Sequence, residues 1–254
     1  MPEPIGGGTG TPSVSTFSEH HRDDYNRVIS MSSPIRYQGR QARRSGSEKR
    51  RQTILEAALR IIVREGVRAV RHRAVAREAD VPLSATTYYF KDITDLIADT
   101  FTMFAERAID DVIEPFRKQA FELLESFDTD SLVQPEKRDQ VIASLAEMTT
   151  EFVLREVGEQ RDHLLAEQAF LQEARLDERL REAARAYVVA QQEPVARACE
   201  RLATPQPELD AEMLWANIVQ LEGRLLLDDA QLDRDGIRRR VHHVLDLLVG
   251  KGGQ

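Results

Sequence analysis

The first sustained pattern of apolar residues in this chain has the spacing of a helix. Ile54, Ala58, Ile61 and Ile62 fall at positions i, i+4, i+7 and i+8, which places them on one stripe. The stripe predicts an amphipathic helix from about Ser47 to Glu65, with its apolar side turned toward a core.

Two shorter helices are predicted after it, with a tight link between them. A helix over residues 71–79 is followed by Asp80 and Val81, which turn the chain, and then by a helix over residues 83–90. Pro82 suits the first turn of that second helix, because its missing N–H would have no partner there. This order of short helices is typical of a helix-turn-helix.

The remaining pattern is also helical. Asp92 is placed to cap a helix that continues toward Phe127, and Pro115 should kink or end it. No segment alternates with the period of a strand. The pattern therefore predicts an all-α protein of about nine helices, the later ones at about 135–157, 161–176, 177–203 (bent at Pro194), 208–228 and 234–249.

Composition narrows the class of protein. The single Cys199 excludes an internal disulfide and suits a reducing cytoplasm, so we expect a cytoplasmic protein. There is no apolar run of about 18 residues, so no membrane partner is expected. No metal-ligand spacing, phosphate loop, nucleophile elbow or dinucleotide motif is present, so we expect no metal, no cofactor and no enzyme.

The charge of the chain is divided unevenly. The net charge is −8, yet residues 36–79 hold 13 Arg or Lys and 4 Glu, a net of +9, which leaves −17 for the rest. A basic segment on an acidic body indicates a part that binds nucleic acid and a second part with another role.

The second short helix carries small polar side chains suited to a DNA groove. The hydroxyls of Ser84, Thr86 and Thr87 can reach base edges, and Ala85 can touch a thymine methyl group. Tyr88 is better placed for a phosphate. We expect two of the three hydroxyl residues to touch DNA.

Cationic side chains flank these groups. Lys91 follows the second short helix, and Arg71, His72 and Arg73 lie at the start of the first one, where a helix N-terminus also attracts phosphate. A helix-turn-helix can be an ordinary helical corner. Here the basic bias and the hydroxyl-rich helix together favour DNA binding.

The first 46 residues are rich in Gly, Ser, Thr, Pro and Arg and have no period, which predicts a disordered basic arm. Its arginines could reach a minor groove or phosphates, or belong to a solvated tail. Met31 is a second plausible start, so translation from Met1 and from Met31 both stay open. The arginines nearest the first helix are Arg36, Arg40, Arg43 and Arg44.

Residues 54–96 resemble the DNA-binding domain of the TetR family of bacterial transcriptional regulators. The resemblance implies an all-helical homodimer whose body binds a small molecule, and the ligand lowers the affinity for a palindromic DNA operator. It also implies three regions: the arm over 1–46, a helix-turn-helix domain over 47–95, and a helical ligand-binding and dimerisation domain over 96–250. The matching residues are Ala57, Ala58, Gly66, Val75, Ala76, Ala79, Val81, Tyr89, Phe90 and Leu96.

Three positions depart from the family pattern. Asp80 stands where the family commonly has Gly, Thr87 where it often has Tyr, and Ile93 where it usually has Lys. The usual phosphate-binding lysine is therefore missing at its place. We expect Lys91 to take over part of its role.

Candidate residues of the body follow from pattern alone. His163, Phe170 and Tyr187 lie beside apolar runs and could line a ligand cavity, or be ordinary helix contacts and core. Apolar stripes near the C-terminus predict a dimer interface of two helices from each chain, or else intramolecular core. The stripes consist of Leu214, Ile218, Leu221, Leu225, Val241, Leu245 and Leu248.

The sequence thus predicts a dimeric repressor that a small molecule releases from its operator. The alternative is a DNA-bound interaction protein whose helical body binds a protein partner. The identity of the effector, the operator sequence and the choice between repression and activation are not determined by these residues.

Overall fold

The structure is a computed structural model that describes residues 45–127, 134–227 and 233–249. All regular structure in these ranges is helical, which confirms the predicted all-α class. The ranges contain nine helices when the unbroken run α5–η2–α6 is counted as one and the three-residue 3-10 helix is left out. The predicted arm over 1–46 lies outside the described residues up to position 44, and residues 45 and 46 already belong to the first described helix.

The N-terminal domain consists of α2 (Ser45–Glu65), the 3-10 helix η1 (Val67–Ala69), α3 (His72–Glu78) and α4 (Leu83–Tyr89). Its core forms because the predicted stripe of α2 faces the short helices and the start of α5. The buried side chains include Ile54, Ala58, Ile61, Ile62, Val70, Val75, Phe90 and Leu96.

Arg51 belongs to this core, although it is a charged residue of α2. Its guanidinium donates to Asp99 Oδ2 at 2.7 Å and lies over the Phe90 ring at 5.5 Å from the centroid. The side chain is therefore enclosed, and it links α2 to α5.

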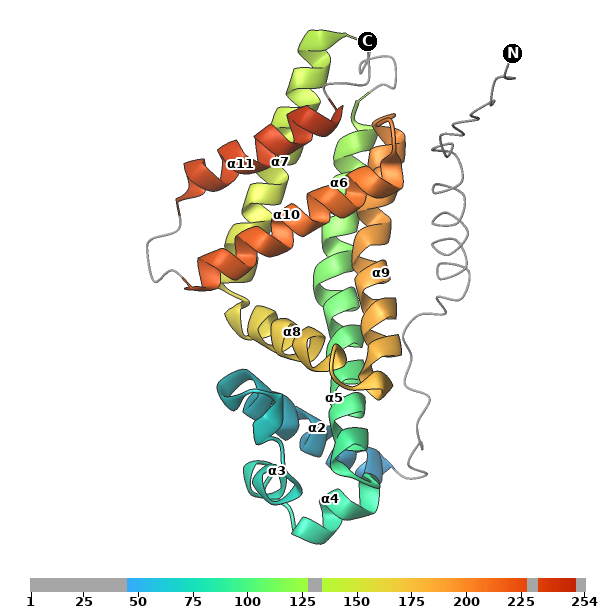
Figure 1. Ribbon diagram of the computed structural model, residues 1–254, viewed down its shortest axis with the longest axis vertical. Helices are drawn as coiled ribbons and strands as arrows, with labels where there is room; N and C mark the ends of the chain where they lie inside the picture. The colour runs from blue at the N-terminus through green and yellow to red at the C-terminus, as the bar shows by residue number, and fades with distance from the viewer. Residues whose placement is uncertain (1–44, 128–133, 228–232, 250–254) are drawn as a thin grey trace, which may run out of the picture. The chain divides into compact units, whose positions relative to one another are not determined.

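A long helical run leads from this domain into the body (Figure 1). It consists of α5 (Ile93–Ala108), the π-helical segment η2 (Ile109–Ile113) and α6 (Glu114–Glu125). The Asp92 carboxylate caps α5 by accepting from the Asp95 N–H at 2.9 Å, as the sequence predicts. Pro115 neither ends nor starts a separate helix. The wider turn of η2 lies directly before it and accommodates the ring, which would clash with the preceding turn of a regular α-helix.

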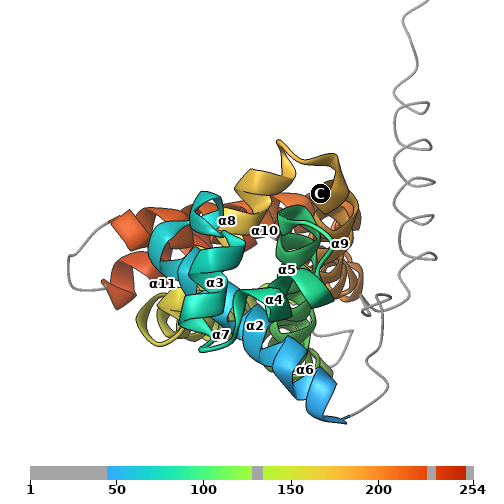
Figure 2. The same ribbon diagram turned by 90° about the horizontal axis from the view of Figure 1, so that it is seen from below.

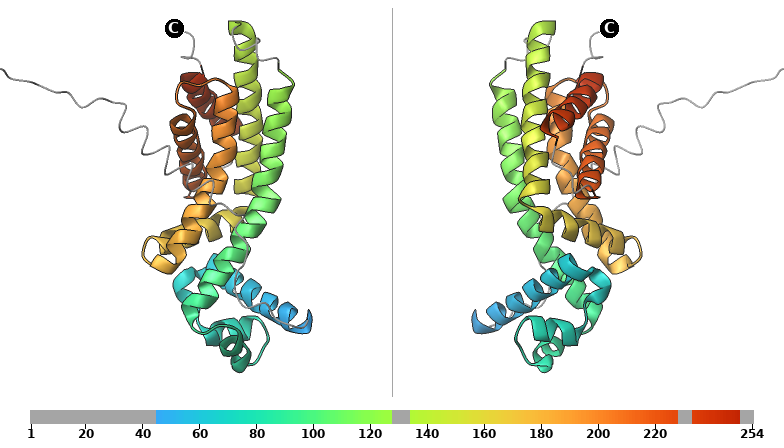
Figure 3. Two further views of the ribbon diagram at one scale, coloured as in Figure 1. Left: turned by 90° about the vertical axis from the view of Figure 1, so that its right-hand side faces the viewer. Right: turned by 90° about the vertical axis from the view of Figure 1, so that its left-hand side faces the viewer.

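The body is completed by α7 (Pro135–Gly158), α8 (Arg161–Ala174), α9 (Glu178–Arg201), α10 (Pro207–Leu227) and α11 (Arg234–Val249). Helices α6, α7 and α9 run roughly along the long axis, and α8 crosses beneath them (Figure 1). Helices α10 and α11 lie along one face of the body (Figure 3). Their apolar sides pack on α9 and α7, respectively.

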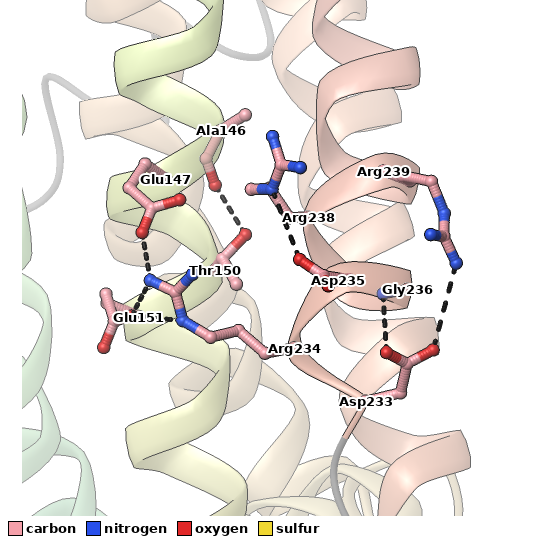
Figure 4. Close-up of polar contacts among 10 residues, drawn as sticks. All are labelled: Ala146, Glu147, Thr150, Glu151, Asp233, Arg234, Asp235, Gly236, Arg238 and Arg239. Carbon is pink, nitrogen blue, oxygen red and sulfur yellow. Dashed lines mark hydrogen bonds and ion pairs between the residues drawn. The ribbon is translucent and has the colours of Figure 1, made fainter.

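Helix α11 is tied to α7 by a small polar network (Figure 4). Arg234 donates to Glu147 and, through Nε at 3.0 Å, to Glu151. Asp233 accepts the Gly236 N–H at 3.0 Å and so caps α11. A Cβ atom on Gly236 would come within 2.3 Å of that carboxylate, so any larger residue would have to displace the Asp233 side chain from this position.

The N-terminal domain touches the body at more places than α5. Helix α8 packs against α2 and η1. Arg179 at the start of α9 pairs with Asp92 at 3.3 Å, the residue that caps α5. A shift of α8 or α9 would therefore reach the N-terminal domain directly.

Candidate nucleic-acid interface

Helices α3 and α4 meet at a turn that Asp80 makes possible. Asp80 has a φ of 51°, in the left-handed region. The Asp80 N–H donates to Arg77 O at 3.3 Å, and the Val81 N–H donates to Ala76 O at 3.0 Å. These two bonds form a Schellman motif. The position needs a residue that tolerates positive φ, and Asp is one of the few besides Gly that does, which accounts for this departure from the family pattern.

Helix α4 lies at the end of the molecule that faces the viewer in Figure 2, and the side chains on its exposed side are mostly polar. Ser84, Thr87 and Lys91 are exposed, and the Tyr88 ring is 78% exposed. Ala85 is half-buried. A helix whose outward face carries hydroxyls and a methyl group can approach base edges, and Tyr88 and Lys91 extend far enough to reach phosphates.

Thr86 is a correction to the predicted set of DNA contacts. Its side chain is fully buried, with an exposed fraction of 0%, and its hydroxyl donates to Leu83 O at 2.8 Å. It points into the core because its direction around the helix axis differs by about 100° from that of Thr87 and by about 200° from that of Ser84, which are both exposed. We therefore remove Thr86 from the candidate contacts.

Most of the cationic side chains predicted to bind phosphate are exposed to solvent. Arg71 and Arg73 are exposed at the start of α3, and Arg71 also donates to Val70 O at 2.8 Å. His72 is half-buried, and its Nδ1 is enclosed without a hydrogen-bond partner among the described residues. Arg77, one turn after Arg73, is exposed too and was missed by the sequence analysis. Its i+4 spacing from Arg73 was the available signal.

The position of Ile93 supports the expected change of phosphate contact. Ile93 is half-buried and packs against the core of the N-terminal domain. Lys91, two residues earlier, is exposed. The apolar side chain at position 93 thus packs against the core. The lysine that is exposed toward DNA, Lys91, lies just before α5.

The predicted ligand residues of the body gather around one aromatic ring. The Phe104 ring centroid lies 4.8 Å from His163, 5.4 Å from Phe170 and 5.9 Å from Tyr187. Phe170 is fully buried in the core. This agrees with the second of the two interpretations of its sequence pattern, core packing in place of a ligand contact. Burial lowers the pKa of His163 to about 4, so its ring is neutral at neutral pH. His163 and Phe104 line an open cavity of about 710 Å³ between α2, α5, η2 and α8.

Tyr187 differs from its aromatic neighbours in having an unsatisfied polar group. Its side chain is fully buried, and the hydroxyl has no hydrogen-bond partner among the described residues. Three buried glutamates on α7, α8 and α10 act on this hydroxyl. Burial, with those carboxylates, raises its pKa well above the ordinary value. The glutamates, missed by the sequence analysis, are Glu156, Glu167 and Glu222.

The residues predicted for dimerisation are in large part core, which corrects the prediction. The apolar stripes of α10 and α11 face α9 and α7 of the same chain, so most of their side chains are not available to a partner. Ile218, Leu221, Val241, Leu245 and Leu248 are buried, and Leu214 and Leu225 are half-buried.

Different residues form the outward face of this pair of helices. Several large apolar side chains on it are exposed, with Met213 at 60% and Leu227 at 84%. Four of them lie on α10, where Leu209 and Met213 are one turn apart, and one lies on α11. This set, the α10/α11 face, consists of Leu209, Met213, Val219, Leu227 and Leu247.

Other classes of site find no support in the described ranges. No group of three His, Cys, Asp or Glu residues there is placed to hold a metal ion. In the same ranges, no helix combines the length and the apolar character that crossing a bilayer requires. Cys199 is buried, and burial raises the pKa of its thiol to about 12, so it is not a reactive thiolate.

Comparison with known proteins agrees with this geometry. Residues 54–100 match the family described as bacterial regulatory proteins, tetR family. No curated protein sequence matches the chain. Among solved structures, a transcriptional regulator (RHA1_ro04179) from Rhodococcus sp. Rha1 superposes with a TM-score of 0.59 at 14% identity, covering 79% of this chain and 96% of that one.

Two further structures share the fold. A member of the TetR family (SCO1917) from Streptomyces coelicolor A3 has a TM-score of 0.51 at 23% identity, covering 77% of this chain and 98% of its own. The multidrug binding protein EbrR, complexed with ethidium, has a TM-score of 0.52 at 24% identity, with the same coverages of 77% and 98%.

The family match and the exposed helix pair together define the N-terminal domain as a DNA-binding domain of the kind found in bacterial transcriptional regulators. The match to the tetR family of bacterial regulatory proteins covers the N-terminal domain over residues 54–100, and the fold of the chain resembles that of a solved member of that family.

Proposed function

We propose that this regulator is a dimeric repressor that leaves a palindromic operator when a small molecule binds its body. The observation that carries the proposal is the exposed face of α3 and α4, with Ser84, Thr87, Tyr88 and Lys91 grouped at one end of the molecule. Because its partner is double-stranded DNA, we also propose the bacterial cytoplasm as its compartment.

The proposed dimer uses the α10/α11 face. Exposed apolar side chains that recur along a helix are typical of surfaces that meet a partner. A single helix of seven residues, as α4 is, reads few base pairs, and a two-fold axis would double the contacts and match a palindrome. Met213 and Leu227 are therefore proposed as interface residues in place of the buried stripe.

The proposed effector site lies inside the body. The buried Tyr187 hydroxyl and the Glu222 Oε1 atom have no partner among the described residues, and unsatisfied buried groups are expected where a ligand supplies the partner. The structure of EbrR with ethidium supports a small-molecule ligand for a body of this fold.

The coupling between effector and operator would pass through helix contacts. Tyr187 of α9 packs on Phe101 and Phe104 of α5, with ring centroids 6.0 Å and 5.9 Å away. Helix α5 continues into the N-terminal domain, so a displacement of α9 would move α4. Half-site spacing is fixed by the DNA, and a change in the separation of two such domains would lower operator affinity.

The alternative, a body that binds a protein partner, is less well supported. A cavity of about 710 Å³ between α2 and the body is within the range that small ligands occupy. The unsatisfied groups around Tyr187 are enclosed and therefore out of reach of a protein surface. Both observations favour a small-molecule effector.

Footprinting on the DNA upstream of the gene, at one fixed salt concentration, tests the proposal. We expect a protected palindrome that the Arg73→Ala variant protects at least tenfold less well. Arg185→Ala removes the same charge from an exposed position of α9 and should leave protection unchanged. The absence of a protected site, or equal effects of the two variants, would contradict DNA recognition through α3 and α4.

A further inference from the structure

Three glutamate side chains meet inside the body where four helices converge. Glu156 of α7, Glu167 of α8 and Glu222 of α10 are each less than 10% exposed. Their charges act on one another and on the hydroxyl of Tyr187, which comes from α9. We call these four residues the acidic cluster.

The acidic cluster is short of positive charge and of hydrogen-bond donors. Gln191 Nε2 donates to Glu167 Oε1 at 2.7 Å. Arg155 acts on Glu156 from a distance, and none of the three carboxylates forms an ion pair within the described residues. Glu222 Oε1 and the Tyr187 hydroxyl have no partner there either.

Burying acids without partners is unfavourable, because a carboxylate loses its hydration and gains nothing in return. Larger apolar residues at these positions would pack more stably. An arrangement that keeps three such acids together, with an unpartnered hydroxyl beside them, is typical of a site where a ligand supplies the missing charge.

The cluster does not suit a metal ion. No group of three His, Cys, Asp or Glu in the described ranges is close enough to hold one. The three carboxylates are therefore not grouped as the ligands of one ion. An organic cation, whose charge is spread over several atoms, can interact with carboxylates that do not converge on one point.

Apolar space lies next to the cluster along the same interior. A cavity of about 50 Å³ is lined by Thr149 of α7, Val195 of α9 and Ile218 of α10, among others. Glu222 follows Ile218 by one turn and Glu156 follows Thr149 by two turns, and both helices run toward α8 (Figure 1). At a rise of about 1.5 Å per residue, positions 222 and 156 lie roughly 6 and 10 Å further along their helix axes than Ile218 and Thr149, which line the cavity.

The larger cavity near His163 is a poor place for a cation. Three arginines, Arg60, Arg64 and Arg107, line it and outnumber its two aspartates, Asp111 and Asp162. The Phe104 ring lines that cavity and contacts the Tyr187 ring, so the two sites adjoin the same aromatic residue. Charge therefore distinguishes the acidic cluster from the open cavity.

We infer that the effector of this regulator is an organic cation with an apolar portion, and that the acidic cluster is its binding site. The inference rests on the proposed function, which it deepens by naming the ligand class. The positive group lies among the three carboxylates and the Tyr187 hydroxyl, and the apolar portion extends toward the cavity beside Ile218.

Calorimetric titration of the full-length protein at pH 8 tests this site. The probes are benzyltrimethylammonium and tetraphenylphosphonium, whose charges do not depend on pH. Tetraphenylborate, an anion with the size and shape of the phosphonium, is the control ligand. We expect at least one cation to bind once per chain and the borate not to bind. No binding by either cation, or equal binding of the borate, overturns the inference.

Variants that remove one carboxylate each test whether the cation binds at the acidic cluster. Glu222→Gln should lower the affinity for the cation at least tenfold. Glu167→Gln, which keeps an oxygen that accepts from Gln191, should lower this affinity as well. Glu182→Gln removes the same charge from an exposed position of α9 and should have no effect. Near-ultraviolet circular dichroism checks that each variant is folded. Unchanged affinity in folded Glu222→Gln and Glu167→Gln overturns the assignment to this cluster.

Operator binding by the same preparations separates this inference from the proposed function. Protein that binds its operator and is released by another compound, but takes up neither cation, contradicts the inference alone. Protein that binds a cation at the cluster but no operator contradicts the proposed function alone. Cation binding that lowers operator affinity supports both.

Discussion

Replacing Glu167 by glutamine should change how the stability of this protein depends on pH. The Glu167 side chain is buried, and burial raises its pKa from 4.5 to about 7. The folded state thus holds a proton on this carboxyl between about pH 4.5 and 7, where the unfolded chain has released it. Its contribution to stability is fully present below about pH 4.5 and is lost as the pH rises through 7.

The size of the effect follows from the two pKa values. At about 1.36 kcal/mol per pH unit, a pKa of about 7 in place of 4.5 corresponds to roughly 3 kcal/mol. Between pH 5 and pH 8, wild-type protein should lose about 2–3 kcal/mol through this group. Glu167→Gln cannot ionise and keeps an oxygen that accepts from Gln191. Relative to wild type, it should therefore gain about 2–3 kcal/mol between these two pH values.

Urea unfolding followed by circular dichroism at pH 5 and pH 8 measures the difference. One protein concentration is used throughout, because association also stabilises the folded state. Glu182→Gln, exposed on α9, is the control and should follow wild type. If the free energies of unfolding of Glu167→Gln and wild type change in parallel with pH, the carboxyl is not held neutral by burial and the reasoning is refuted.

Three further outcomes are expected. Lys91→Ala should reduce the slope of log affinity against log salt for operator binding by about 1; an unchanged slope would mean that Lys91 touches no phosphate. Met213→Asp should shift the protein toward monomer in sedimentation analysis, while Leu176→Asp, an exposed apolar position outside the α10/α11 face, should not; equal behaviour would place the interface elsewhere. Arg51→Leu should lower the free energy of unfolding by about 1–3 kcal/mol, because the charge-assisted bond to Asp99 is lost; unaltered stability in urea would count against that bond.

The difference between Thr86 and Thr87 shows where sequence reasoning reaches its limit. Both are hydroxyl residues on a helix of seven residues, and composition treats them alike. Their directions differ by about 100° around the helix axis, so one is buried and the other exposed. The short helix offers too few apolar positions to fix its buried side by periodicity alone.

The C-terminal stripes show the same limit on a larger scale. Leu221 and Leu245 have the spacing of an interface and also of a core, and the pattern does not say which partner covers them. In the structure they are covered by the same chain. The α10/α11 face has fewer apolar residues than the predicted stripes, and Met213 is its most central member. Its pattern in the sequence is therefore weaker than that of the stripes.

What the sequence determined by itself is local. Helical periodicity, Asp92 as a cap, the charge division and the order of the short helices specified an all-α regulator with a helix-turn-helix, because these features depend on neighbours within a few turns. Only the tertiary structure decided which side chains share a space. Glu156, Glu167 and Glu222 are far apart in sequence and ordinary in composition. They become a site because packing of α7, α8 and α10 removes them together from water.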